Sequence, residues 1–320
     1  MKKRKYNKYH TSIIIAACYL VALGGYEQAQ AVNASFMYTL SSFTGPIIYD
    51  GARVYVDAAR NEAYVVSKGI AKVFNGNGME IYRFNSGNEL GAISSLDFDQ
   101  EGNIYTLSYM NGYLHASYNI VRCNYRGEPQ STIEIKGIPS RFTDFMPRYM
   151  AYRDRQFYLA DPSSLRVVIT DMSGQVQKSF DLIAVLELKE SDRQDNEMGG
   201  FSVDKDGNML FTMPTLFSAS VLSPDGKIAS FGTAGSIPGK FANISDIIRD
   251  NRGNILVADK LKDVVNIFDK DFSFLMEFGG RGIAPENLVI PQSIALDSDN
   301  KLFVTQASSR GVSVFRLLYN

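Results

Sequence analysis

Histidine, the side chain that most often transfers protons or binds metals near neutral pH, is almost absent from this chain. The 320 residues contain two, His10 and His115. A zinc or copper site made of several imidazoles is therefore excluded, as is lyase chemistry that depends on one. A Ser-His-Asp hydrolase would have to use His115, and the sequence has no Gly-x-Ser-x-Gly elbow. We expect His115 to be a surface residue of a hairpin loop, and we assign no catalytic residue.

Carboxylates are plentiful, and several recur at similar places in the chain. Each follows an apolar segment and precedes a tight turn, where Asp commonly accepts hydrogen bonds from backbone amides. Because each belongs to its own repeat, we expect them to support separate turns rather than to meet in one ligand site. The set is Asp57, Asp97, Asp204, Asp250 and Asp297; Asp161 and Asp259, which end later strands, are interpreted in the same way.

These aspartates belong to a repeated phrase: an apolar triplet, an acidic residue, a turn centred on Gly or Asn, and a second apolar triplet. The clearest copies are residues 201–211, 247–257 and 294–304. Gly and Asn supply the positive φ that a tight hairpin needs, so each copy predicts a β-hairpin. Six copies follow one another at roughly 40 to 53 residues, the spacing of four-stranded propeller blades. We therefore predict an all-β, six-bladed β-propeller of antiparallel blades, as a single domain over residues 32–320.

The last repeat is incomplete, because the chain ends at Asn320 just after its third strand. A missing strand would leave an open sheet edge. The segment from Ala34 to Phe43 precedes the first repeat and has the apolar pattern of an outer strand. We predict that this N-terminal strand completes the last blade and closes the ring.

Taken together, these units resemble the NHL-repeat family of six-bladed β-propellers, in its exported bacterial type. The resemblance is best over residues 239–315, where Gly239-Lys240-Phe241 and residues 278–282 match the family's linker and Ala258-Asp259 matches its second-strand ending. It implies a rigid ring that binds through loops on one face. The first three units diverge most, and residues 153–156 replace the acidic residue and Gly-Asn turn of the third.

The first residues have the layout of a secretory signal peptide. A basic segment is followed by an apolar run from Ile13 to Leu23 and by Ala29-Gln30-Ala31, where a signal peptidase would cut. We expect residues 1–31 to be removed and the protein to be exported, to the periplasm or the extracellular space. Retention as an uncleaved membrane anchor and lipidation at Cys18 are the alternatives.

The part after residue 31 is mildly acidic, with 28 Lys and Arg against 33 Asp and Glu. A nucleic-acid-binding protein would instead carry a basic stripe, so nucleic acid is not an expected partner. Contact with a membrane is expected only through an uncleaved N-terminal segment. Cys123 is the one thiol of this part, and we expect a small core residue.

The residues just before the innermost strands should surround the mouth of the central channel. By alignment of the repeats they include a fork-shaped donor, an aromatic face, a carboxylate and an amide, which suit a polar ligand or a peptide loop. These are Arg148, Tyr149, Asp246 and Gln292. The alternative is a calcium-dependent lactonase of the gluconolactonase kind, whose oxygen ligands converge on a metal over the channel. Only Asp246 is acidic among the aligned residues and Arg148 would repel a cation, so we predict no metal and no cofactor.

Two insertions add surface for a partner. Residues 109–118 form an aromatic extension of the second unit, with Tyr109 and Tyr113 as candidate interface anchors. Residues 182–196 begin apolar and become charged, which indicates a short helix with a solvated end. The sequence thus predicts a non-catalytic scaffold that binds a protein or peptide of the cell envelope, with the lactonase or hydrolase as the alternative.

Overall fold

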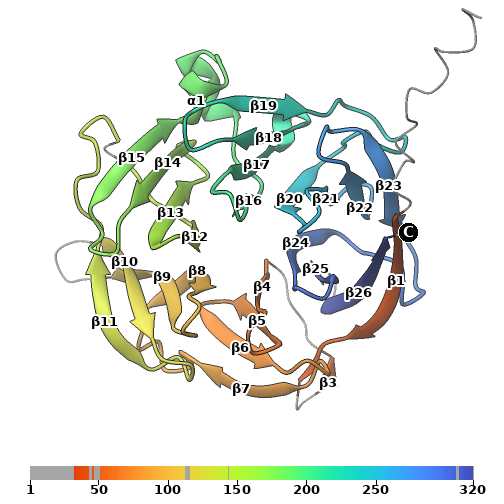
Figure 1. The fold of residues 1–320 in the computed structure, drawn as a ribbon, viewed down its shortest axis with the longest axis horizontal. Coiled ribbons are helices and arrows are strands. Elements are labelled where there is room, and N and C mark those ends of the chain that lie inside the picture. The colour runs from red at the N-terminus through yellow and green to blue at the C-terminus, as the bar shows by residue number, and fades with distance from the viewer. Residues whose placement is uncertain are drawn as a thin grey trace, which may run out of the picture.

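A computed structural model describes residues 32–42, 45–46, 51–111, 116–142, 144–307 and 310–319. Six four-stranded antiparallel sheets stand around a central axis as blades (Figure 1). The prediction of an all-β, six-bladed propeller is confirmed. The expected signal segment, residues 1–31, lies outside the described residues. No helix in the described ranges is long and apolar enough to cross a membrane.

Each blade is built in chain order from the innermost to the outermost strand. Blade 1 comprises β4 (Arg53–Asp57), β5 (Glu62–Ser67), β6 (Ile70–Phe74) and β7 (Glu80–Phe84), and blade 2 comprises β8 (Ala92–Phe98), β9 (Ile104–Asn111), β10 (Ala116–Cys123) and β11 (Pro129–Glu134). Blade 3 comprises β12 (Tyr149–Arg153), β13 (Gln156–Asp161), β14 (Arg166–Thr170) and β15 (Val176–Asp181), and blade 4 comprises β16 (Phe201–Val203), β17 (Met209–Met213), β18 (Ser218–Leu222) and β19 (Ile228–Phe231). Blade 5 comprises β20 (Ile244–Arg249), β21 (Ile255–Asp259), β22 (Val264–Phe268) and β23 (Phe274–Gly279).

Blade 6 joins the two ends of the described chain, as the incomplete last repeat predicts. It contains β24 (Pro291–Leu296), β25 (Lys301–Gln306), β26 (Val312–Tyr319) and, as its outermost strand, β1 (Val32–Thr39). Strand β1 runs antiparallel to β26, with Val32 opposite Tyr319 and Thr39 opposite Ser313. The closing strand therefore begins and ends earlier than the predicted 34–43, and the short strands β2 (Ser41–Ser42) and β3 (Gly45–Pro46) follow it.

The core lies between the blades, because neighbouring sheets pack face to face. Strands β21, β22 and β25 are buried at every position, which explains why apolar residues stand next to one another in them instead of alternating with polar ones. Between blades 5 and 6, for example, Val265 and Ile267 pack with Leu302 and Val304. Outer strands such as β11 are largely exposed.

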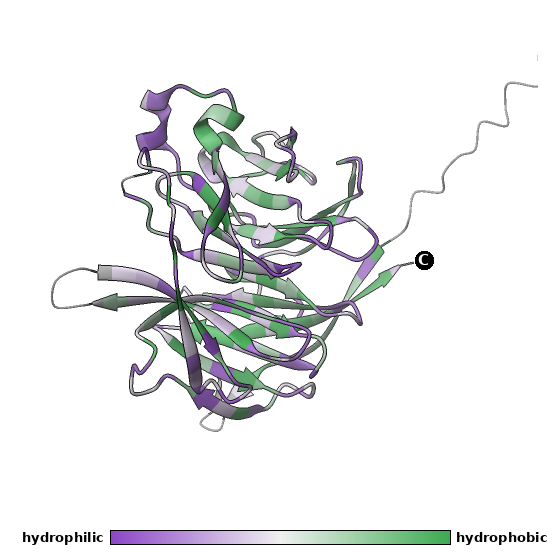
Figure 2. Cartoon of the chain, turned by 60° about the vertical axis from the view of Figure 1, so that its left-hand side comes forward, coloured by the Kyte–Doolittle hydropathy of each residue, from purple (hydrophilic) through white to green (hydrophobic). Residues whose placement is uncertain are grey.

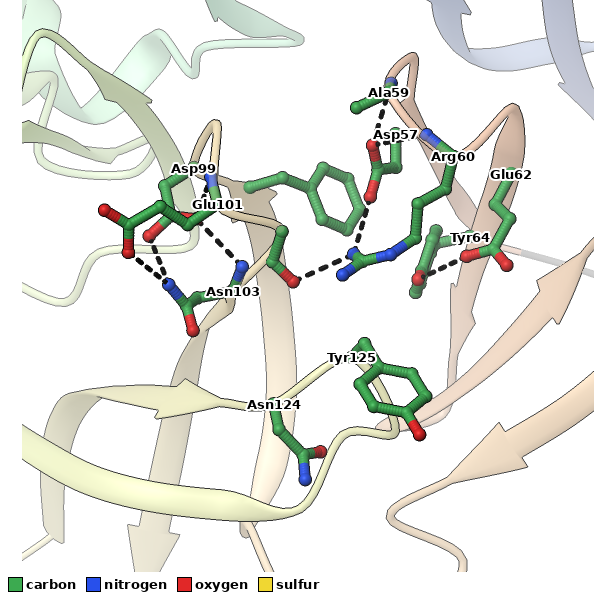
Figure 3. Close-up of polar contacts among 12 residues, drawn as sticks. Asp57, Ala59, Arg60, Glu62, Tyr64, Asp99, Glu101, Asn103, Asn124 and Tyr125 are labelled. Atoms are coloured by element: carbon green, nitrogen blue, oxygen red, sulfur yellow. Dashed lines mark hydrogen bonds and ion pairs between the residues drawn. The ribbon is translucent and has the colours of Figure 1, made fainter.

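The repeated aspartates support turns, as predicted, with one correction. Asp57 accepts hydrogen bonds from the amides of Ala59 and Arg60 at 3.0 and 3.2 Å (Figure 3). In blade 2 the turn is held by Asp99, which accepts from the amides of Glu101 and Asn103 at 3.0 and 2.8 Å. Asp97, which we had expected to do this, lies two residues earlier and bonds to blade 3 instead. Asp204, Asp250 and Asp297 repeat the pattern of Asp99, and Asp161 and Asp259 hold loops at the ends of second strands.

The divergent hairpin of blade 3 reaches the same result with a different turn. Asp154 and Arg155 both have positive φ, 49° and 60°, as a two-residue hairpin turn requires. Its sequence therefore replaces the Asp-turn-Gly phrase without changing the strand pairing.

Removal of β1 should open the ring. A chain that begins at Leu40 loses four half-buried apolar or aromatic side chains at alternate positions of β1 and exposes the edge of β26. We expect a loss of unfolding free energy on the order of 5 kcal/mol and a broadened transition. Thermal and urea unfolding followed by circular dichroism would measure this, with a chain beginning at Val32 as the matched control. A transition of equal midpoint and steepness in both chains would contradict the closure.

The thiol of Cys123 should be unreactive in the folded protein. Its side chain is fully buried, and burial raises the pKa of the thiol to about 12, so the reactive thiolate is scarce at pH 8. In a chain beginning at Val32, an aromatic disulfide reagent should label Cys123 only after unfolding in guanidinium. A variant with Tyr125→Cys, at an exposed turn, is the control that should react at once. Rapid labelling of Cys123 in native buffer would show that this prediction is wrong.

Candidate functional site

The innermost strands create the polar character of the channel. Each is paired with a second strand along one edge only, so the peptide groups of its other edge face the axis without a strand partner. Side chains of the preceding blade bond to them. Ser95 accepts a hydrogen bond from the amide of Met150 at 3.1 Å and donates to its carbonyl at 3.2 Å. Asp97 accepts from the amide of Tyr152 at 2.8 Å.

One position of the repeat forms a ring at the channel mouth, the end of the channel at which the chain enters the innermost strands. It lies four residues before the turn aspartate, or before Arg153 in blade 3. Three blades place large polar side chains there and three place small residues. In order around the ring they are Arg53, Ser95, Tyr149, Gly200, Asp246 and Ser293.

Arg53 and Tyr149 meet across this ring. The guanidinium carbon of Arg53 lies 3.7 Å from the centroid of the Tyr149 ring, a close cation–π contact. Tyr149 is held in place by its hydroxyl, which donates to the carbonyl of Gly199 at 2.5 Å. Burial acts to lower the pKa of Arg53, but interactions with Tyr149, Tyr55 and Asp246 outweigh it and the pKa is raised. The arginine therefore stays charged at the channel mouth.

Asp246 also lines the channel mouth, and it links blade 5 to blade 6 by a hydrogen bond. Its Oδ1 accepts from the amide of Ile247 at 3.0 Å and its Oδ2 from the amide of Ile294 at 2.9 Å. Burial raises the pKa of Asp246, against the effect of these hydrogen bonds and of Arg53. The preceding blade leaves room for it, because a Cβ at Gly200 would lie 2.4 Å from the Asp246 Cα.

Two adjoining cavities meet at these residues. A cavity of about 200 Å³ follows the channel, and one of about 160 Å³ forms the mouth; both are lined by Arg53, Tyr149, Asp246 and Ser293. The mouth is further lined by Gln292, whose Oε1 accepts from the amide of Gly51 at 2.7 Å, and by Lys260. The arrangement presents cationic and amide donors around an aromatic face, which suits an anionic or polar guest.

The structure brings together three of the four residues predicted for the channel mouth. Tyr149, Asp246 and Gln292 line the same cavity. Arg148 is exposed and does not line it; burial raises the pKa of Tyr118 in the β9–β10 hairpin, and the charge of Arg148 acts against that shift. At the equivalent places of blades 5 and 6 both neighbours line the mouth, Ser245 with Asp246 and Gln292 with Ser293, so blade 3 differs in directing only Tyr149 to it.

Arg53 is the mouth residue that the sequence prediction missed. It stands four residues before Asp57, the spacing that also separates Asp246 from Asp250. Extending the alignment of inner strands to blade 1 would therefore have found it.

The predicted insertions are partly described. Tyr109 packs against Tyr118 across the β9–β10 hairpin, with ring centroids 5.1 Å apart, whereas Tyr113 and His115 lie outside the described residues. The segment after blade 3 forms helix α1 (Leu182–Val185) and 3-10 helix η1 (Glu190–Asp195), as its composition indicates. Arg193 fixes this segment to the propeller through Asp181, at 2.9 Å. A second 3-10 helix, η2 (Pro214–Leu216), follows β17.

Within the ranges that the structure describes, no three His, Cys, Asp or Glu side chains come together as a potential metal-ligand set. The described carboxylates of the channel are instead engaged by amides and arginines.

No family model and no curated protein matches the chain. Among solved structures, a protein of unknown function from Bacteroides thetaiotaomicron aligns with a TM-score of 0.66 and 13% identity, over 90% of this chain and 76% of that one. An auxiliary nutrient binding protein from Bacteroides ovatus gives 0.61 and 11%, over 89% and 77%. A catalytically inactive virginiamycin B lyase from Staphylococcus aureus gives 0.53 and 13%, over 85% and 83%. These likenesses show a shared propeller fold, and no family model supports the narrower NHL-repeat assignment.

Replacing Ser95 by Ala should destabilise the ring without touching its apolar core. The variant leaves the buried amide of Met150 without its partner and also removes the acceptor for the Tyr55 hydroxyl. We expect a loss of about 1–3 kcal/mol of unfolding free energy. Urea unfolding would measure it, with Ser163→Ala on an exposed turn as the control. Equal stability of the two variants would contradict the role assigned to Ser95.

Proposed function

We propose that this chain is an exported, non-catalytic six-bladed propeller that binds a protein or peptide partner of the cell envelope. Export is inferred from the basic and apolar segments of residues 1–31 and from Ala29-Gln30-Ala31. Binding is inferred from the asymmetry between the two ends of the propeller. The observation that carries it is the concentration of insertions and exposed apolar side chains around the channel mouth.

The mouth face is the end at which the innermost strands begin. In a four-stranded antiparallel blade, the connections between the second and third strands and the connections to the next blade all lie at this end. The β9–β10 hairpin and the segment of α1 and η1 are such connections, and both project toward the left in Figure 2. Long connections on a rigid scaffold are the usual carriers of binding residues.

The same connections carry strongly exposed apolar side chains. Leu261 is 67% exposed and Ile237 is 60% exposed. Their loops are joined by Lys262, whose Nζ donates to the carbonyl of Ile237 at 3.1 Å. We call Ile237 and Leu261 the mouth-face patch. Other exposed apolar residues on these connections are Met146, Leu216 and Ile283.

The opposite face is built mainly of short polar turns. The turns that follow the innermost strands are centred on Asp, Asn, Gly and charged residues, held by their own aspartates. Met79 and Tyr125 are the strongly exposed apolar and aromatic side chains that the described turns of this face carry. Partner contact is therefore better served by the mouth face.

A binding role accounts for the mouth better than metal-dependent lactone hydrolysis does. A hard cation needs several oxygen ligands that converge on it. Here the guanidinium of Arg53 lines the mouth, where it would repel a cation, and both oxygens of Asp246 accept hydrogen bonds from backbone amides.

The mouth-face patch can be tested by charge. The double substitution Ile237→Asp and Leu261→Asp places two carboxylates in the patch, and the cost of burying them against a partner should reduce capture by about tenfold or more. Affinity capture from an envelope fraction, with mass spectrometry to identify a protein that the wild-type chain retains, provides the readout.

The control for this test is Met79→Asp with Tyr125→Asp, on the opposite face, and both variants should melt as the wild type does. Equal loss of the retained protein in both variants, or none in the patch variant, would contradict a partner on the mouth face. Turnover of lactones stimulated by calcium would contradict the non-catalytic part of the proposal.

A further inference from the structure

We propose that Arg53 is the anchor for a carboxylate, supplied by an acidic side chain that the partner inserts into the channel mouth. The inference rests on the proposed function and specifies its chemistry. Three arginines line the channel, and they differ in how their charges are paired.

Two of these arginines have carboxylate partners in a neighbouring blade. Arg153 lies 3.0 Å from Asp97 of blade 2, and Arg249 lies 2.6 Å from Asp204 of blade 4. Arg53 differs from both, because no carboxylate of the described residues lies within 4.0 Å of it. Its nearest described partner is the face of the Tyr149 ring.

Asp246 does not complete an ion pair with Arg53. Its two oxygens are engaged by the amides of Ile247 and Ile294, which fixes the carboxylate to the wall of the channel. It therefore affects Arg53 through space rather than by direct contact. A half-buried guanidinium that has no ion-pair partner among the described residues can donate its N–H groups to a new carboxylate.

The stacking geometry selects the direction of approach. One planar face of the guanidinium is covered by Tyr149, so an anion must approach through the N–H groups at the edge. A carboxylate in the same plane can accept two parallel hydrogen bonds there, which a lysine ammonium could not reproduce. Lys260 adds a second positive charge at the rim of the mouth.

The size of the mouth indicates how the carboxylate arrives. Sites that enclose a whole small-molecule ligand usually measure about 300–1,000 Å³. The mouth cavity measures about 160 Å³ and the channel cavity that adjoins it about 200 Å³, so the two together only reach the lower end of this range. The mouth cavity alone accommodates one inserted side chain, with the rest of the partner resting on the mouth face.

The test uses two blocked amino acids as probes: N-acetyl-glutamate methylamide and its glutamine counterpart, which is neutral and nearly the same shape. Titration of the chain beginning at Val32, followed by NMR of arginine Nε–H groups, measures both dissociation constants. We expect the wild type to favour the glutamate probe by about tenfold and the preference to weaken with added salt.

Arg53→Gln should abolish this preference, and Arg53→Lys should keep only part of it. Arg126→Gln is the matched control, because Arg126 also lies over a tyrosine, Tyr125, at 5.4 Å, but on the opposite face. It should retain the full preference. Circular dichroism melts show whether each variant is folded, and the comparison of the two probes on the wild type needs no variant.

Equal binding of the two probes by the wild type would overturn the inference, and so would a preference that survives in a folded Arg53→Gln variant. The result is separable from the proposed function. Partner capture that depends on Ile237 and Leu261 but shows no carboxylate preference at Arg53 would retain the mouth-face interaction and remove the anchor. A carboxylate preference that depends on Arg53, together with partner capture that does not depend on Ile237 and Leu261, would retain the anchor and remove the mouth-face partner.

Discussion

The inner edge of each blade is the constraint on which the channel depends. Six strands turn one edge toward the axis, where no further strand can pair with them, and their buried peptide groups must still be satisfied. Short polar side chains of the preceding blade do this, among them Ser95, Asp97 and Asp246. The channel is therefore polar for structural reasons, and polarity alone does not mark a ligand site. Arg53 stands out because its guanidinium contacts the aromatic ring of Tyr149 instead of bonding to such a peptide group among the described residues.

The architecture was predictable because its signals are local. An aspartate, a turn residue with positive φ and two apolar triplets define a hairpin within about ten residues, and six such hairpins define the ring. The site was less predictable, because strand direction matters at single-residue precision. Arg148 and Tyr149 are neighbours in sequence, but only Tyr149 lines the mouth. Asp99 accepts hydrogen bonds from its own turn, whereas Asp97, two residues earlier, bonds to blade 3. Strand register separates such residues, and the repeat pattern alone did not supply it.

The two ends of the propeller have diverged to different degrees. Turns on the face away from the mouth are held by the same aspartate chemistry in most blades, so their sequences are similar. Connections on the mouth face vary in length, and they range from the charged segment of η1 to loops that expose Ile237 and Leu261. A uniform scaffold at one end permits this variation at the other, while buried residues of the connections, such as Leu182 and Ile183, also pack into the core between blades.

The pairing of β1 with β26 also determines when the last blade can fold, relative to synthesis of the chain. Val32–Thr39 is among the first of the described segments to be synthesised and Val312–Tyr319 is the last, so blade 6 cannot form until the whole propeller sequence is available. Contacts of such long sequence separation form slowly. During export as proposed here, the chain would thus remain unclosed while it is threaded through a membrane, and its ring would be completed on the far side.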